Sequence, residues 1–251
     1  MADDAAATSI VTQQIDYTSG DVTMKGYLAY DSSIDSQRPG VLVVHEWWGH
    51  NEYSRRRAEM LAELGYTALA IDMYGDGKTA EHPDDAMAFA QQIGSDMDEA
   101  RARFEAARAL LARHETTDGE RIGAIGYCFG GSVVLEMARR GVDLDGVASF
   151  HGGLGTAAPA ARGAISGSIL VLHGGLDPMA PAEQVQAFRN EMDAAGADYE
   201  IVVYDDATHG FTNPAADSAA ARFELPLAYN PDADRQSWDK MKAFFADAFS
   251  D

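Results

Sequence analysis

The chain has a single cysteine, Cys128, and only four lysines among its 251 residues. One cysteine excludes an intramolecular disulfide framework and a cysteine-rich zinc site, and it agrees with a reducing compartment. No apolar run approaches the roughly 18–20 residues that cross a bilayer. The N-terminus is acidic and lacks the positive and apolar regions of a signal peptide. We therefore expect a cytoplasmic protein that is not attached to a membrane.

Basic residues of any kind are also few. Forty Asp and Glu residues stand against 19 Lys and Arg, which gives a formal net charge of −21. Nucleic-acid binding requires clustered cations that neutralise phosphates, so this class of function is excluded. The one dense basic run, Arg55 to Arg57, lies in a predicted helix, and we expect it to form a solvated face with nearby acids.

Short apolar runs alternate with helix-like stretches along most of the chain. Two β-rich runs joined by a polar turn predict an N-terminal hairpin, and the later runs predict strands and helices in alternation. The predicted strands are 10–17, 22–30, 41–45, 67–73, 122–127, 146–150, 169–173 and 199–204, and the predicted helices are 52–64, 84–114 with a break near Gly94, 131–140, 181–195 and 235–249. This order predicts one mostly parallel, doubly wound α/β sheet with helices on both faces. It forms a single domain over residues 10–251, after a flexible N-terminus at residues 1–9.

The lone cysteine lies in a sharp-turn motif between a predicted strand and a predicted helix. The run Gly126-Tyr127-Cys128-Phe129-Gly130-Gly131 has the layout of a nucleophile elbow, with cysteine where the G-x-S-x-G pattern has serine. Its glycines let the backbone turn without crowding the nucleophile. The helix that follows directs free N–H groups and its positive dipole end at the sulfur, which favours a thiolate and a developing oxyanion. The alternative is a buried structural cysteine.

Two further candidates, Asp177 and His209, come directly after two of the later predicted strands. A thiol is only slightly ionised at neutral pH, so it needs an imidazole as base, and the imidazole needs an acid that fixes its orientation. Nucleophile, acid and histidine follow the order that α/β-hydrolases use, and ligands in such sheets bind at the carboxyl ends of the strands. Asp205 and Asp206 compete with Asp177 for the acid's role, and each residue alone also fits an ordinary loop.

Four segments resemble the dienelactone hydrolase family of α/β-hydrolases, in the same order and with similar spacing from about residue 15 to 250. They are His45-Glu46-Trp47-Trp48-Gly49, the elbow segment 126–131, Gly174-Gly175-Leu176-Asp177-Pro178 and His209-Gly210-Phe211. The resemblance implies an α/β-hydrolase fold and ester cleavage by a Cys128–His209–Asp177 triad without metal or cofactor. It also implies that Glu46 contacts the cysteine and helps to manage its proton. The backbone N–H groups of Trp47 and Phe129 would form the oxyanion hole.

Two departures from the family pattern affect the expected substrate. In that family two arginines hold the substrate carboxylate, one just after the strand-end Asp-x-Tyr and one four residues beyond the catalytic histidine. Here Gly75, Asp76 and Gly77 follow Tyr74, and the second position is Asn213. Neither Asn nor Asp can replace a bidentate arginine clamp. We therefore expect a small-molecule substrate that is a neutral ester or lactone, with aryl phosphotriester hydrolysis as a plausible side activity.

Aromatic residues near these positions are the candidate substrate contacts, because aromatic walls line most small-molecule sites. They are Trp48, Tyr74 and Phe211. The segment from His45 to His50 is superficially similar to the zinc motif H-E-x-x-H, but its second histidine comes five residues after the first, so no metal site is expected.

Two other classes of function fit parts of the pattern. A redox-responsive or ligand-binding thiol protein would use an exposed thiol, yet it would need neither an ordered histidine nor an oxyanion hole. A dinucleotide-binding dehydrogenase fits the fold class, but no G-x-G-x-x-G follows the first parallel strand. His151 also follows a predicted strand, and the sequence gives it no role. The natural substrate and the oligomeric state stay open.

Overall fold

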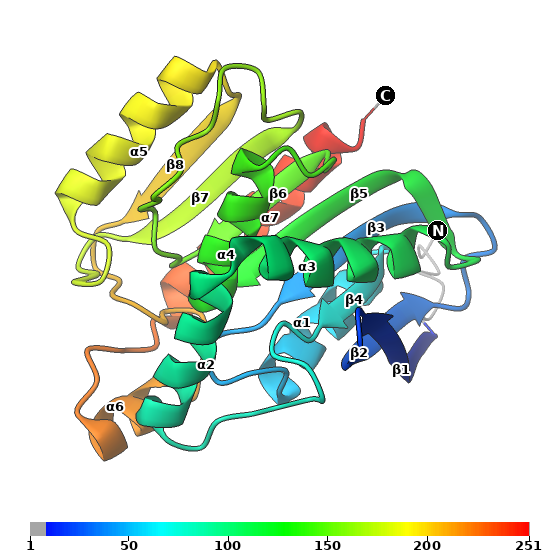
Figure 1. Ribbon diagram of the computed structural model, residues 1–251, viewed down its shortest axis with the longest axis horizontal. Helices are drawn as coiled ribbons and strands as arrows, with labels where there is room; N and C mark the ends of the chain where they lie inside the picture. Colours follow the sequence, from blue (N-terminus) through cyan, green and yellow to red (C-terminus); the bar gives the residue numbers. More distant parts are fainter. Residues whose placement is uncertain (1–8, 251) are drawn as a thin grey trace, which may run out of the picture.

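Eight strands form one sheet through the middle of the protein (Figure 1). The computed structural model describes residues 9–250, so the predicted flexible N-terminus lies outside it except for Ser9. The strands are β1 (Ile10–Ser19), β2 (Val22–Asp31), β3 (Arg38–Val44), β4 (Thr67–Ile71), β5 (Thr117–Tyr127), β6 (Gly146–Phe150), β7 (Ser168–Gly174) and β8 (Tyr199–Tyr204). Their order across the sheet is β1-β2-β4-β3-β5-β6-β7-β8.

The sheet is parallel from β4 to β8, and the hairpin β1–β2 adds two antiparallel strands at one edge. This confirms the predicted fold class. Neighbouring strands also end in register, since Val44 pairs with Gly126 and Tyr127 pairs with Phe150. The residues that follow these strands therefore leave the sheet at one common edge, the carboxyl edge.

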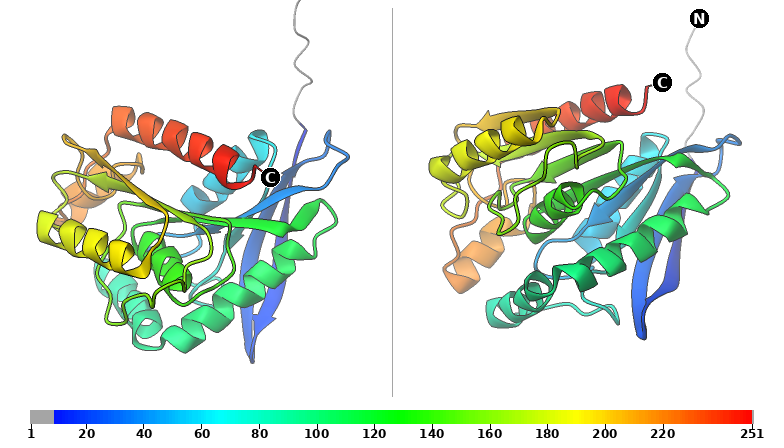
Figure 2. Two further views of the ribbon diagram at one scale, coloured as in Figure 1. Left: turned by 90° about the horizontal axis from the view of Figure 1, so that it is seen from above. Right: turned by 45° about the horizontal axis from the view of Figure 1, so that its top comes forward.

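Helices cover both faces of the sheet. They are α1 (Glu52–Glu63), α2 (Pro83–Ser95), α3 (Met97–Ala112), α4 (Phe129–Arg139), α5 (Ala182–Ala195), α6 (Ala216–Phe223) and α7 (Pro231–Ala248). Helices α3, α4 and α5 lie on one side and α1 and α7 on the other (Figure 2). The apolar side chains of each group pack on the sheet as a separate core, which is how an α/β sheet buries both of its faces.

The predicted break in the long helical stretch is confirmed, some helix ends differ from their predicted positions, and one helix was not predicted. The long helical stretch is broken at Asp96, whose side chain accepts a hydrogen bond from the Glu99 N–H and so begins α3. Helix α4 starts at Phe129, directly after the cysteine. The short α6 follows the histidine loop, and in Figure 1 it lies beside α2, away from the sheet.

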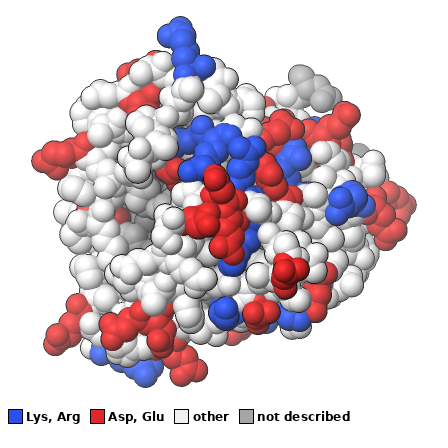
Figure 3. All heavy atoms as spheres, viewed as in Figure 1, with Lys and Arg blue, Asp and Glu red and all other residues white. Residues whose placement is uncertain are grey.

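Charged side chains of both signs are interspersed on the face seen in Figure 3. Surface ion pairs include Arg108 of α3 with Asp143 at 2.7 Å and Arg140 with Asp98 of α3 at 3.1 Å. Among residues 9–250, no helix has the length and apolar character that a membrane span requires.

Candidate active site

The turn at Cys128 has the backbone of a nucleophile elbow. Cys128 lies between β5 and α4 with φ 54° and ψ −116°, a conformation that few non-glycine residues adopt. The flanking glycines are required by space, because a Cβ on Gly126 would lie 2.1 Å from the Gly130 carbonyl oxygen. A Cβ on Gly130 would lie 2.3 Å from the Val44 carbonyl oxygen. The strand, the helix and the glycines together hold a half-buried thiol at the carboxyl edge.

His209 and Asp177 form a buried pair, with His209 Nδ1 and Asp177 Oδ2 2.8 Å apart. The other carboxylate oxygen of Asp177 accepts the Met179 N–H at 2.8 Å. Burial raises the pKa of Asp177, but the hydrogen bond and charge of His209 outweigh this and lower it below 3.8. Asp177 is thus the acid that is hydrogen-bonded to the histidine. Asp205 and Asp206, the competing candidates, are exposed.

The charge of His209 depends on its neighbours. Burial lowers the pKa of His209, whereas the Cys128 sulfur and the Asp177 carboxylate raise it, with a net result of about 10. Its Nε2 atom has no partner at full hydrogen-bond geometry among residues 9–250, yet a hydrogen bond with the Cys128 side chain contributes to the raised pKa of His209. Asp177 therefore holds one nitrogen of the ring, and the raised pKa of His209 favours the imidazolium form.

The backbone N–H groups of Trp47 and Phe129, the expected oxyanion-hole donors, have no hydrogen-bond acceptor among residues 9–250. Phe129 is the first residue of α4, so its N–H has no partner within the helix. Trp47 follows β3, the strand beside β5, and in the described part of the chain neither amide donates a hydrogen bond. Tyr74 donates from its hydroxyl to the Trp47 carbonyl at 2.9 Å, which fixes the loop that carries the Trp47 amide.

Glu46 lies in the same loop and is almost completely buried. Burial raises the pKa of Glu46 above 4.5, although the hydrogen bond from Asn213 and the charges of His209 and Arg57 act in the opposite direction. Its Oε2 accepts from Asn213 Nδ2 at 2.6 Å. The implied contact with Cys128 is not among the hydrogen bonds of residues 9–250, so Asn213 is the partner of Glu46 here.

The candidate substrate contacts lie in different surroundings. Trp48 is half-buried and packs against Trp47 and against Phe223 of α6, with ring centroids 5.1 and 6.1 Å apart. Tyr74 is buried, and its hydroxyl donates a hydrogen bond to the Trp47 carbonyl. Phe211 is fully buried beside Tyr204, so the expectation that it contacts substrate is not supported by its position. Of the three, only Trp48 is partly exposed.

One predicted surface residue, Arg57, is instead buried. Its guanidinium donates to Asp234 Oδ1 at 2.7 Å and to the Thr212 carbonyl at 2.8 Å, and it lies over the rings of Tyr53 and Tyr127. The prediction of a solvated basic face was wrong for this residue. Helix periodicity could have shown it, since Arg57 shares the buried face of α1 with residues four positions along, such as Leu61.

His151, which the sequence left without a role, lies directly behind the elbow. It follows β6, is fully buried, and accepts the Cys128 N–H on its Nδ1 atom at 3.1 Å. The signal that could have found it is its place at a strand end, the same signal that singled out Asp177 and His209. Residues 9–250 contain no group of three or more His, Cys, Asp or Glu side chains arranged to hold a metal ion.

The chain is similar to known proteins over nearly its whole length. The sequence model of the dienelactone hydrolase family matches residues 24–249. The chain belongs to the dienelactone hydrolase family. A dienelactone hydrolase-like promiscuous phosphotriesterase from metagenomic libraries is 35% identical, with a TM-score of 0.90 over 96% of this chain and 100% of that chain. A putative carboxymethylenebutenolidase of Aquifex aeolicus is 24% identical over 238 residues, which are 93% of this chain and 97% of the relative.

The fold is also that of more distant α/β-hydrolases. An α/β-hydrolase enzyme from a Medee basin deep-sea metagenome library is 14% identical but superposes with a TM-score of 0.70 over 94% of this chain and 98% of its own. Membership of the dienelactone hydrolase family makes this chain a hydrolase of the ester-cleaving class.

Proposed function

We propose that the protein hydrolyses neutral carboxylic esters or lactones without a metal ion, with Cys128 as the nucleophile. The observation that carries this proposal is the joint arrangement of the cysteine at the elbow and the buried His209–Asp177 pair, whose pKa values depend on one another. A redox-responsive or ligand-binding thiol would not require such a pair.

In the first step, the Cys128 thiolate attacks the carbonyl carbon of the ester. The tetrahedral oxyanion accepts hydrogen bonds from the Trp47 and Phe129 amides, whose positions are fixed before the reaction. When the intermediate collapses, His209 donates the Nε2 proton to the leaving oxygen, and Cys128 retains the acyl group as a thioester.

In the second step, neutral His209 takes a proton from water as the water attacks the thioester carbonyl. The oxyanion of the second tetrahedral intermediate is stabilised by the same two amides. Collapse of this intermediate expels the Cys128 thiolate, which then lies beside the protonated His209 as at the start. Asp177 stabilises the imidazolium in both steps and does not exchange its own proton.

The surroundings favour a neutral acyl group over an anionic one. Asn213 uses its amide on Glu46, and Asp76 lies in the loop after Tyr74. Arg103 does reach that loop, where it donates to the Met73 carbonyl at 2.8 Å, but it is buried and paired with Glu99. A substrate carboxylate would lie near acidic side chains, and no unpaired arginine of residues 9–250 would be available there to neutralise it. Repulsion between like charges would therefore oppose its binding.

Aryl phosphotriesters are a second candidate substrate class. The 35% identical relative is a promiscuous phosphotriesterase, and a neutral triester develops negative charge on its phosphoryl oxygen when a nucleophile attacks. The same two amides would stabilise that charge. We propose that this activity uses the same cysteine.

The test is Cys128→Ala, assayed with p-nitrophenyl butyrate and with diethyl p-nitrophenyl phosphate in the presence of a chelator. Both activities should be lost from the variant while the chelator leaves wild type unaffected, and an acyl adduct should appear by intact mass only in wild type. Ester turnover above a tenth of wild type would falsify the cysteine mechanism.

A pair of substrates tests the preference for neutral acyl groups. p-Nitrophenyl butyrate and p-nitrophenyl hemisuccinate share a leaving group and differ in acyl charge. We expect kcat/KM to be at least about tenfold higher for the neutral ester, because like charges are repelled from the site. Equal values would contradict the proposed substrate class and leave the nucleophile intact.

A further inference from the structure

His151 connects the loop of the nucleophile to the loop of the catalytic histidine. Its Nδ1 atom lies 3.1 Å from the Cys128 amide nitrogen, which also donates to the Phe150 carbonyl at 3.0 Å. Its Nε2 atom lies 2.7 Å from Thr212 Oγ1. Thr212 follows His209 by three residues, so one imidazole ring spans the two loops whose side chains must meet.

The hydrogen bonds fix the tautomer of this ring. A backbone N–H can only donate, so Nδ1 of His151 must be unprotonated, and the proton is on Nε2 and points to Thr212. Burial, together with the charges of His209 and Arg57, holds the pKa of His151 well below its usual range. The link is therefore neutral and does not repel the His209 imidazolium, whose ring centroid is 5.3 Å away.

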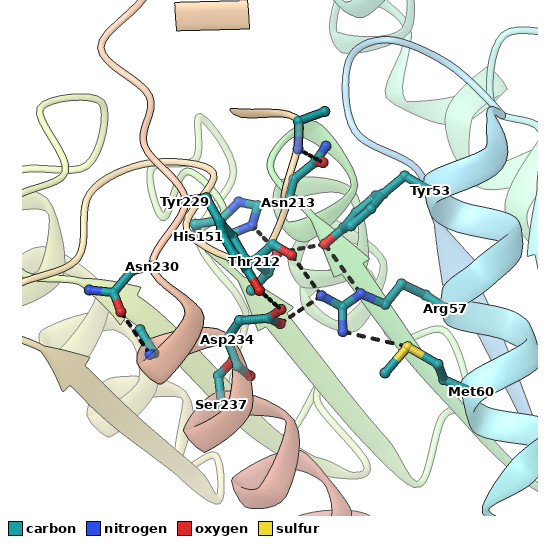
Figure 4. A network of polar contacts seen from close by, with 12 residues as sticks. Tyr53, Arg57, Met60, His151, Thr212, Asn213, Tyr229, Asn230, Asp234 and Ser237 are labelled. Atoms are coloured by element: carbon teal, nitrogen blue, oxygen red, sulfur yellow. Dashed lines mark hydrogen bonds and ion pairs between the residues drawn. The ribbon is translucent and has the colours of Figure 1, made fainter. Parts of the chain in front are cut away.

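The far end of the link is anchored in a buried network, drawn in Figure 4. Thr212 Oγ1 lies 2.6 Å from the Tyr53 hydroxyl, and the Thr212 carbonyl accepts from Arg57 at 2.8 Å. Arg57 is in turn held by Asp234 of α7. In Figure 4 the side chains of Tyr53, Arg57 and Asp234 converge on Thr212 from α1 and α7. Thr212 is thus held in place by several hydrogen bonds, so it can position the His151 ring that is hydrogen-bonded to it.

We propose that His151 and Thr212 are positioning residues that set the distance between the Cys128 sulfur and the His209 ring. The proposal rests on the proposed function, because it assumes that these two groups react together. Cys128 needs such support, since a non-glycine residue at φ 54° is strained and persists only where its surroundings hold it. Neither His151 nitrogen is free to move a proton during turnover, so its contribution is geometric.

The first experiment breaks the link at its threonine end. Thr212→Val keeps the shape of the side chain but removes Oγ1, and we expect kcat to fall roughly 10- to 100-fold with KM changed less than about threefold. Thr212→Ser retains the hydroxyl and should keep most of the activity. Thr67→Val is the matched control, because Thr67 is equally buried and its Oγ1 lies 2.8 Å from Thr116 Oγ1 at the amino edge of the sheet.

The second experiment tests the two hydrogen bonds of the His151 ring one at a time. In His151→Asn the amide can still accept from the Cys128 N–H but is too short to reach Thr212, whereas in His151→Gln the amide can reach Thr212 but offers no acceptor at the Nδ1 position. Each variant should lose kcat about as Thr212→Val does. Wild-type kcat in either variant contradicts a link that needs both ends.

A double-mutant cycle distinguishes positioning from a general loss of stability. Residues of one link are coupled, so Thr212→Val combined with His151→Asn should lose about as much kcat as the worse single variant and far less than the product of the two losses. Multiplied losses, or a kcat for Thr212→Val that matches Thr67→Val at equal loss of melting temperature, would overturn the inference. Cys128→Ala is measured alongside: if it stays active, both proposals fail, and if it is inactive, only the link is at issue.

Discussion

At the carboxyl edge of the sheet, the left-handed backbone positions include Cys128 and His151, with φ of 54° and 40°. At the amino edge, where α1 turns into β4 and α5 turns into β8, the left-handed positions are Gly65 and Gly196. Glycine adopts this conformation with no steric penalty, whereas other residues do so only under constraint. At these four positions, glycine stands where only a turn is needed, and strain is accepted where the side chain lies at the candidate site.

The polar groups at the two edges differ in the same way. At the amino edge, Asp145 Oδ2 accepts the Ile122 N–H at 2.7 Å and Thr67 binds Thr116, so the polar contacts close the ends of strands. At the carboxyl edge, His209 Nε2 and both ring nitrogens of the buried His50 have no partner at full hydrogen-bond geometry in the described part of the chain. Unpaired buried polar groups destabilise a fold, so an unpaired ring nitrogen on His209, next to Asp177, is consistent with a site kept for chemistry.

Among the variants that test this difference between the two edges of the sheet, Asp177→Asn should have the largest effect. The amide cannot stabilise the His209 imidazolium, so kcat should fall about 10³- to 10⁴-fold while the fold is retained. Asp206→Asn is the control, because Asp206 is an exposed acid close to His209 in sequence. Steady-state kinetics of both variants decide the matter, and an equal loss in Asp206→Asn would contradict the role of Asp177.

The same variant has a signature in the pH dependence of stability. The pKa of His209 is raised from 6.5 to about 10 in the folded state, so its stabilising effect is fully present below pH 6.5 and is lost as the pH rises through about 10. Because Asp177 causes part of this shift, Asp177→Asn should flatten the decline in unfolding free energy between pH 6.5 and 10. Urea unfolding at several pH values measures it.

A smaller effect is expected when the network beneath the carboxyl edge is broken. Arg57→Met leaves Asp234 and the Thr212 carbonyl without their donor in a buried setting, which should reduce the unfolding free energy by about 3 kcal/mol. Its neighbour Arg56 is exposed and pairs with Glu59 and Glu63. Arg56→Met should change stability by less than about 1 kcal/mol. Similar values for the two variants in urea unfolding would remove the distinction between these arginines.

The strand ends were predictable because the rules that govern them are local. Continuous apolar runs mark buried parallel strands, and the residue after each run must lie at the carboxyl edge. That reasoning led to Cys128, Asp177 and His209, and the structure pairs the last two as expected.

Contacts between distant loops were not predictable in this way. The pairing of Glu46 with Asn213 joins residues 167 positions apart, and that of His151 with Thr212 joins residues 61 positions apart. No periodicity encodes such contacts. Helix α6 was missed for another reason: Ala216 is its only fully buried residue, so it lacks the apolar stripe by which a helix is recognised.

The smallest predicted effect concerns Glu46. Because its pKa is raised by burial, the folded protein binds this proton more tightly than the unfolded chain does. Wild-type stability should therefore fall as the pH rises from about 4.5 through the raised folded value. Glu46→Gln removes the titration, and its amide oxygen can still accept from Asn213.

We expect Glu46→Gln to be more stable than wild type by about 1 kcal/mol at pH 8, with the difference vanishing near pH 4, because a buried charge is no longer formed. Melting temperatures at the two pH values measure this, and the exposed Glu81→Gln serves as the control. A uniform gain at both pH values would indicate better packing and not a removed charge. A gain confined to the higher pH, together with reduced turnover, would identify Glu46 as a carboxylate kept at the carboxyl edge at the expense of stability.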